Sequence, residues 1–164
     1  MTQSGRSLGT IRSAMIREII ESDIPSLFKV RVATRENAMT LDELTGVGVT
    51  EESIRDVIKG THRGWLYEID RSVVGFAMGD YEAAELTVIA ILPSYENRGI
   101  GSQLLSIVEK WLHSKGCLKI WLTTDIDPSL RAYGFYIKHG WEESKLEDGL
   151  RYMTKNLVGC CSDD

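Results

Sequence analysis

The sequence has few of the residues that brace a secreted protein or anchor a membrane protein. Its 164 residues include three cysteines, an odd number that makes no disulfide framework. We therefore expect a reducing compartment, the cytoplasm. No apolar run approaches the roughly 20 residues that a membrane-spanning helix needs, so we expect no membrane span.

An excess of positive charge is also lacking. The formal net charge is −5, which argues against a general nucleic-acid or anionic-membrane surface and is compatible with a cationic amine as substrate. The chain shows no cluster of His and Cys at metal-ligand spacing, so we expect no metal.

What is present is the composition of one ordinary globular domain, with 43% hydrophobic and 26% charged residues. We expect this domain over residues 15–158, between a flexible extension (1–14) and a polar tail (159–164). The Arg and Ser residues of the extension leave an organelle transit peptide as the alternative. A homodimer is left open.

Hydrophobic periodicity and turn residues predict the elements. Strands are expected over 16–21, 65–69, 73–78, 85–92 and 118–124, helices over 24–37, 51–59, 99–115 and 130–139, and a closing hairpin over 141–146 and 150–157. Residues 38–49 are expected to form a loop. The strand–helix–strand unit over 85–124 predicts a parallel crossover, and the other strands are expected to pair antiparallel. The fold class is therefore α/β (α+β).

The chain is organised around the turn that follows the apolar strand 85–92. Pro93 ends that strand, and Arg98-Gly99-Ile100-Gly101-Ser102 leads into an amphipathic helix. The first N–H groups of a helix lack internal partners, and glycines let a ligand approach them, so this turn can bind a phosphate or pyrophosphate. The alternative is a plain turn that needs glycine for close packing. The segment 98–102 is not a Walker loop, because no Gly-Lys-Ser/Thr follows it.

This turn, together with Phe135-Tyr136-Ile137-Lys138-His139-Gly140-Trp141, resembles the GNAT superfamily of acetyl-CoA-dependent N-acyltransferases. The family motif is Arg/Gln-x-x-Gly-x-Gly/Ala after a strand, and here Glu96 stands where Arg or Gln is usual. The resemblance covers residues 16–157. It implies a single-domain fold with a central mixed sheet of about seven strands and helices on both faces.

The resemblance also implies where acetyl-CoA, the co-substrate, would bind. Its pyrophosphate would lie on the amides of the glycine turn. Its pantetheine arm would bond main-chain groups of the central strand, in the gap where two parallel strands splay apart. A further contact is implied near the helix 130–139, where a Ser replaces the family's usual Asn. The residues concerned are Arg98, Gly99, Ile100, Gly101 and Ser102, then Ile89, Ala90, Ile91 and Leu92, and last Ser129 and Ala132.

Two residues are candidates for catalysis. Glu85 falls where several GNAT enzymes carry a general base, and it or a water would take the proton of the ammonium. Tyr136 falls where many of them carry a Tyr that assists departure of the CoA thiolate. The alternatives are a solvated acid at a strand start and a core aromatic residue. His62 is interpreted as a surface-loop histidine.

The early helix would form a substrate wall in this family. Arg31, Arg35, Glu36 and Asn37 could face a cleft there, or form a solvated charged face. The mechanism that the resemblance implies is direct, sequential transfer of acetyl to a small-molecule amine, with the carbonyl oxygen held by a strand amide near Ile91. A protein lysine or N-terminal amine, or an acyl-CoA-binding module without turnover, are the alternatives.

Overall fold

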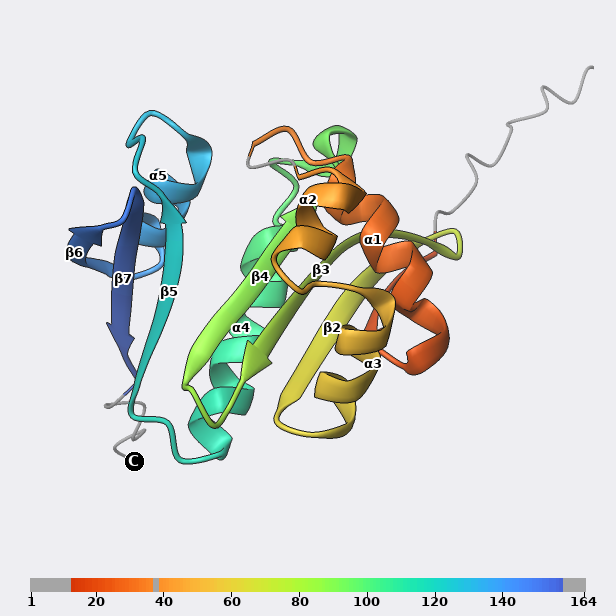
Figure 1. Ribbon diagram of the computed structural model, residues 1–164, viewed down its shortest axis with the longest axis horizontal. Coiled ribbons are helices and arrows are strands. Elements are labelled where there is room, and N and C mark those ends of the chain that lie inside the picture. Colours follow the sequence, from red (N-terminus) through yellow and green to blue (C-terminus); the bar gives the residue numbers. More distant parts are fainter. Residues whose placement is uncertain (1–12, 37–38, 158–164) are drawn as a thin grey trace, which may run out of the picture.

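A seven-stranded mixed sheet, in the order β1-β2-β3-β4-β5-β7-β6, forms the centre of the computed structural model, which describes residues 13–36 and 39–157 (Figure 1). Neighbouring strands are antiparallel except β4 and β5, which are parallel. The strands are β1 (Ala14–Glu18), β2 (His62–Ile69), β3 (Ser72–Asp80), β4 (Glu85–Ile91), β5 (Lys119–Asp125), β6 (Glu142–Glu147) and β7 (Leu150–Asn156). The predicted α/β class and mixed sheet are confirmed.

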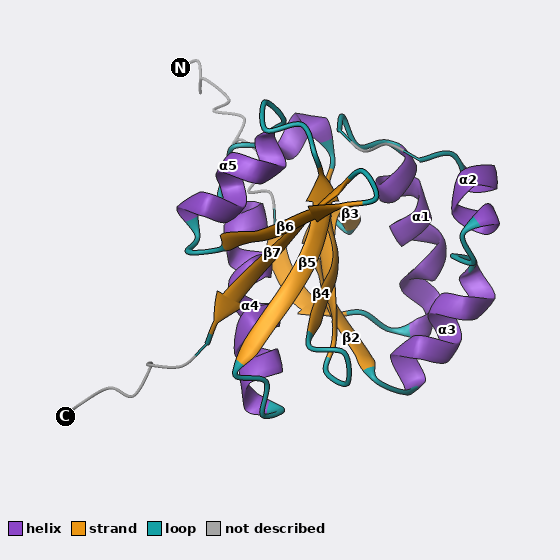
Figure 2. Ribbon diagram, turned by 60° about the vertical axis from the view of Figure 1, so that its left-hand side comes forward, coloured by secondary structure: helices purple, strands orange, loops and turns teal. Residues whose placement is uncertain are grey.

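Helices cover both faces of this sheet (Figure 2). α1 (Ile24–Val32), α2 (Leu41–Gly46) and α3 (Glu51–Lys59) lie on one face, and α4 (Ile100–Ser114) and α5 (Arg131–Lys138) on the other. Each face has its own cluster of buried side chains. Because the sheet separates the two clusters, β3 and β4 are packed on both faces.

α4 packs its apolar stripe onto the centre of the sheet. Leu104, Leu105, Val108 and Leu112 are at most 1% exposed, as their helical spacing predicts. Burying side chains of this size contributes about 1.5–3 kcal/mol each relative to leaving them exposed. The packing of α4 therefore holds the glycine turn at its N-terminus in a fixed place beside β4.

The structure differs from the sequence prediction in the segment before α3. The predicted helix 24–37 ends at Val32, and the loop expected over 38–49 contains α2. A capping box begins α2: Glu43 N–H donates to Thr40 Oγ1 at 3.1 Å, and Thr40 N–H donates to Glu43 Oε2 at 3.4 Å. The Thr-x-x-Glu signature of such a cap stands in the sequence. The first strand also begins earlier than predicted, at Ala14.

The expected N-terminal extension lies outside the described residues except for 13 and 14, and so do the expected tail and Asn37. Cys117 is buried, as expected of a small apolar side chain. Within the part of the chain that the structure describes, no helix has the length and apolar character needed to cross a membrane.

Candidate active site

The glycine turn presents an uncapped helix N-terminus. Gly99 is the N-cap of α4 and has φ +80°, a left-handed conformation that costs other residues roughly 1–2 kcal/mol. Since Gly99 has no side chain, it leaves the amides of Ile100, Gly101 and Ser102 uncapped, and these carry the positive end of the helix dipole. A Cβ at Gly99 would meet nothing within 4 Å, so an anion has room beside the turn.

A cavity of about 510 Å³ opens from this turn, between β4 and β5. The two strands pair only at Glu85 and Trp121 and then diverge, as Figure 1 shows. The expected gap between splayed parallel strands is thus present. Its lining comes from the central strand (86–91), the residues before and in the glycine turn (95–97 and 99–102), β5 (122–124), α1 and the segment after it (31 and 34–36), and α5 with its C-cap (131, 132, 135, 136, 138 and 139).

Two residues of β4 direct their main-chain N–H and C=O groups toward this cavity. Leu92 N–H donates to Val74 O of the neighbouring segment at 2.9 Å. Main-chain groups of successive strand residues point to opposite sides, so those of Ile91 and Ile89 point toward β5. Because β5 has diverged there, these groups face the cavity. A carbonyl or amide of a ligand can pair with them.

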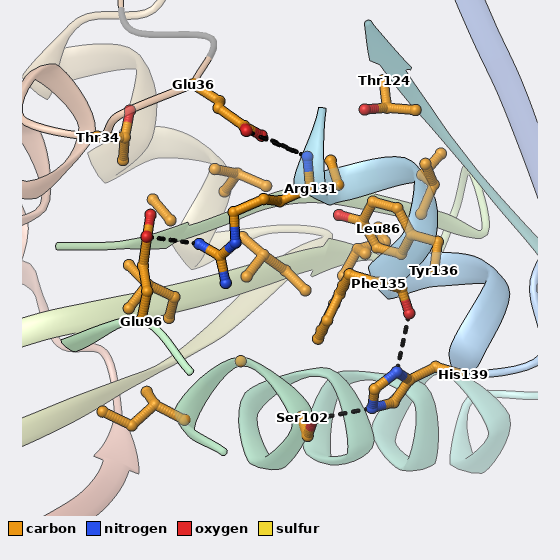
Figure 3. Close-up of a pocket in the computed structure, with 18 of the residues that line it drawn as sticks. Thr34, Glu36, Leu86, Glu96, Ser102, Thr124, Arg131, Phe135, Tyr136 and His139 are labelled. Atoms are coloured by element: carbon orange, nitrogen blue, oxygen red, sulfur yellow. Dashed lines mark hydrogen bonds and ion pairs between the residues drawn. The ribbon is translucent and has the colours of Figure 1, made fainter. Parts of the chain in front are cut away.

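Tyr136 comes from α5 and points its hydroxyl into the cavity (Figure 3). Its ring packs edge-on against Phe135 at 5.3 Å and Trp141 at 5.8 Å, and the residue is 9% exposed. Burial raises the pKa of Tyr136 well above its usual value. The phenol is therefore protonated at neutral pH and can donate a hydrogen bond. Tyr136 thus packs its ring in the core, as one alternative expected, and also lines the cavity.

His139 connects α5 to the first turn of α4 (Figure 3). Its Nδ1 lies 2.9 Å from Phe135 O, and its Nε2 lies 2.8 Å from Ser102 Oγ. A carbonyl oxygen only accepts, so Nδ1 carries the hydrogen and, in the neutral ring, Nε2 accepts from the Ser102 hydroxyl. The link holds the two walls of the cavity together. Sequence reasoning did not find it.

Glu96 lies in a cluster of charges at the cavity (Figure 3). Its carboxylate is 2.6 Å from Arg131 Nη1 and 3.8 Å from Arg35 Nε. Arg131 Nη2 also donates to Asn97 Oδ1 at 3.0 Å, and Arg131 N–H donates to Glu36 Oε2 at 2.9 Å. The two guanidinium groups compensate the carboxylate, which explains how an acid is accommodated near the uncapped N-terminus of α4. Arg131 was missed, although it directly precedes Ala132.

Glu85 lies at the far end of β4 from the glycine turn. It pairs across the strands with Asp80, which pairs with His62, so the three side chains share one face of the sheet. Burial, and secondarily the charge of Asp80, raises the pKa of Glu85. Burial lowers the pKa of His62, whose Nε2 is 3.8 Å from Asp80 Oδ2. The interpretation of His62 as a surface-loop residue was wrong, because it lies in β2 and is half-buried.

A second cavity, of about 410 Å³, lies on the α1 face of the sheet and includes His62 in its lining. It shares Arg31, Thr87 and Val88 with the first cavity. Met78 pairs with Val88 but Gly79 pairs with Leu86, so Thr87 is the extra residue of a bulge. The two cavities therefore adjoin where β4 is irregular.

The structure brings most of the predicted cofactor-binding residues together. Those in the lining of the first cavity are Ile89, Ala90, Ile91, Gly99, Ile100, Gly101, Ser102 and Ala132, with Tyr136 opposite. Arg31, Arg35 and Glu36 also line it, so they face a cleft, as one of the two readings of this helix expected.

Four predicted residues lie outside that lining: Glu85, Leu92, Arg98 and Ser129. Leu92 uses its N–H toward Val74 and its carbonyl toward Tyr95 N. The guanidinium of Arg98 stacks over the Tyr95 ring at 5.1 Å. Ser129 donates its hydroxyl to Asp127 Oδ1 at 2.7 Å; it does not cap α5, whose N-cap is Leu130.

Among residues 13–36 and 39–157, no three His, Cys, Asp or Glu side chains stand close enough together to hold a metal ion.

Comparison with known proteins gives a consistent result. The model of the acetyltransferase (GNAT) family matches residues 28–141. A solved structure of PaiA N-acetyltransferase from Thermoplasma acidophilum, in complex with coenzyme A, is 22% identical. The alignment covers 88% of this chain and 99% of that one, with a TM-score of 0.76.

Two further solved structures are similar. An acetyltransferase of the GNAT family from Staphylococcus aureus is 20% identical over 88% of this chain and 99% of that one, with a TM-score of 0.72. A ribosomal-protein-alanine N-acetyltransferase from Brucella melitensis is 18% identical over 87% and 99%, with a TM-score of 0.68. At these identities the solved structures show the fold alone.

Proposed function

Because the chain belongs to the GNAT family of acetyltransferases, we propose that it transfers the acetyl group of acetyl-CoA to the primary amine of a small molecule. One observation carries the proposal: an uncapped helix N-terminus at Gly99 opens onto a cavity that has the Tyr136 hydroxyl on its opposite wall. The turn supplies an anion site, and the tyrosine supplies a proton donor 37 positions along the chain, on another element.

The donor would be held mainly by main-chain groups. The amides of Ile100, Gly101 and Ser102 suit a pyrophosphate, because they are uncapped and lie at the positive end of α4. The main-chain groups of Ile89 and Ile91 suit the amides of a pantetheine arm. We confine the strand contacts to Ile89 and Ile91. The main-chain groups of Ala90 are directed toward β3, and both main-chain groups of Leu92 are already bonded within the protein.

The reaction then requires three catalytic functions from the protein. Glu85, directly or through a water, takes the proton of the ammonium so that its nitrogen can attack the acetyl carbonyl. A strand amide that faces the cavity stabilises the negative charge that develops on the carbonyl oxygen. Of the two such residues, we choose Ile89 rather than Ile91, because it lies nearer to Glu85 along β4. Tyr136 donates a hydrogen bond to the departing thiolate. The raised pKa values of both side chains suit these roles: the shift makes the Glu85 carboxylate a stronger base than an ordinary one, and it keeps the Tyr136 phenol protonated.

A second candidate acceptor is the N-terminal amine of a protein. It is favoured by the likeness in fold to the ribosomal-protein-alanine N-acetyltransferase. The third candidate is a binding module without turnover, which the replacement of the usual Arg or Gln by Glu96 would favour. The ion pairs of Glu96 with Arg35 and Arg131 account for that replacement without loss of the anion site.

The test is release of CoA thiol from acetyl-CoA, measured across small amines, lysine-bearing peptides and peptides with a free N-terminus. Release with small amines supports the proposal, and initial rates plotted against both substrates should give intersecting lines, as direct transfer requires. Release with peptides alone favours the second acceptor. Acetyl-CoA binding without release from any acceptor favours the module. Failure to bind acetyl-CoA refutes the reading of the glycine turn.

The odd number of cysteines supports a reducing location such as the cytoplasm, and Cys117 is a buried free thiol. Reagents in solvent should therefore react slowly with the Cys117 thiol. The rate of thiol labelling of Cys117 in the native protein checks this.

A further inference from the structure

The second cavity has walls that suit an apolar molecule. α1, α2 and α3 close it on one side, and β2, β3 and β4 form the other. Apolar side chains contribute most of its lining, among them Leu27, Phe28, Met39, Leu44, Ile54 and Val57. Its volume of about 410 Å³ is within the usual range for sites that bind small molecules.

Its position makes it a neighbour of the donor cavity. Arg31, Thr87 and Val88 belong to both linings, so the two cavities adjoin at the bulge of β4 and only these side chains stand between their occupants. Glu85 lies two residues from Thr87 along β4. Direct transfer requires this kind of contact between donor and acceptor, with a base nearby.

The charges of the cavity select against a polycation. None of the described residues that line it is Asp or Glu. Arg31 contributes a positive charge, and burial lowers the pKa of His62, which favours its neutral form. Moving several ammonium groups from water to such a site would leave them without counter-charges, at a high cost. A single ammonium is different. It can sit at the His62 edge, where Asp80 and Glu85 share the same face of the sheet.

We propose that this second cavity is the acceptor site and that the acceptor is a primary amine carried on an uncharged, apolar body, an arylalkyl- or alkylamine. The inference rests on the proposed function and names its substrate class. Polyamines and peptides are disfavoured by the apolar lining. Each methylene buried against it is worth roughly a fourfold gain in affinity.

The experiment compares ethylamine, hexylamine, spermidine and a peptide with a free N-terminal alanine as acceptors, by release of CoA thiol. It uses the full chain and two matched variants on α3. Val57→Glu places a carboxylate in the cavity wall, and Lys59→Glu adds the same side chain to the same helix outside the lining. Val57→Phe reduces the volume without adding charge, in case Val57→Glu does not fold. Acetyl-CoA binding and the melting temperature are measured for each.

We expect kcat/KM for hexylamine to exceed that for ethylamine and spermidine at least tenfold. Val57→Glu should lower it at least tenfold with the KM for acetyl-CoA unchanged, and Lys59→Glu should stay within twofold of the parent. Val57→Phe should reduce the advantage of hexylamine over ethylamine. Calorimetry with CoA in place of acetyl-CoA, where no transfer can occur, should show hexylamine binding that Val57→Glu removes.

Two results overturn the inference while leaving the proposed function intact: thiol release that favours spermidine or the peptide, and equal effects of Val57→Glu and Lys59→Glu. Failure of the proposed function has a different signature, which is the absence of thiol release with every acceptor. That result would overturn the acceptor role of the cavity as well.

Discussion

Replacing Tyr136 with Phe tests the proposed chemistry while leaving the fold in place. The substitution keeps the ring that packs against Phe135 and Trp141 and removes only the hydroxyl that points into the cavity. We therefore expect the melting temperature and the affinity for acetyl-CoA to change little. What is lost is a hydrogen bond that forms fully only when the thiolate departs.

The size of the effect follows from the charge of the acceptor. A hydrogen bond to a charged group contributes about 1.5–3 kcal/mol, and each 1.36 kcal/mol of activation free energy is about tenfold in rate. We expect kcat to fall by about 10- to 150-fold, with the KM for acetyl-CoA nearly constant. In the parent, burial keeps the phenol protonated, so Tyr136 should impose no loss of rate as the pH rises from 8 toward 10.

The assay is thiol release at saturating amine, with Tyr133→Phe as the control. Tyr133 is on the same helix but outside the cavity lining, and its ring lies 4.4 Å from the Arg151 guanidinium. This variant should match the parent. A kcat for Tyr136→Phe within twofold of the parent would show that Tyr136 is only a packing residue. A rise in KM equal to the fall in kcat would mean that the hydroxyl binds the donor in its ground state.

Three further predictions test the turn, its neighbour and the base. Gly99→Ala places an L-residue at φ +80° and should lower the free energy of unfolding by about 1–2 kcal/mol, which calorimetry would show as a drop of several degrees in melting temperature. The control is Gly134→Ala in α5, where a Cβ meets nothing within 4 Å, and it should not lower the melting temperature. Glu96→Gln removes a negative charge beside the anion site and should tighten CoA binding about threefold to tenfold by titration calorimetry; weaker binding would mean that the ion pair to Arg131 positions the turn. Glu85→Gln should lower kcat/KM about 100-fold or more, the usual contribution of a general base. Because the pKa of Glu85 is raised, the parent should lose activity as pH falls through a value above the ordinary Glu range, and Glu85→Gln should lack that limb of the pH profile.

The sequence alone was sufficient for the elements whose signal is local. The apolar positions of α4 recur every three or four residues, and they are buried as that spacing predicts. Gly99 and Gly101 follow a strand that ends at proline, which identified the turn. The α2 helix also had a local signal, the Thr40 and Glu43 capping box, which the prediction of a loop overlooked.

The tertiary structure decided what surrounds the turn. Glu36 and Arg131 meet although they are 95 positions apart, and Ser102 meets His139 across 37 positions. The same holds for the second cavity, whose walls come from three helices and three strands. Ser129 and Arg98, by contrast, were expected in the site, but their side chains contact residues two or three positions away along the chain. Hydrophobic periodicity and turn residues predict the secondary structure of each segment, because both are local properties of the sequence. Which side chains meet depends on how the packed elements are placed, and that is set by the burial of the whole core.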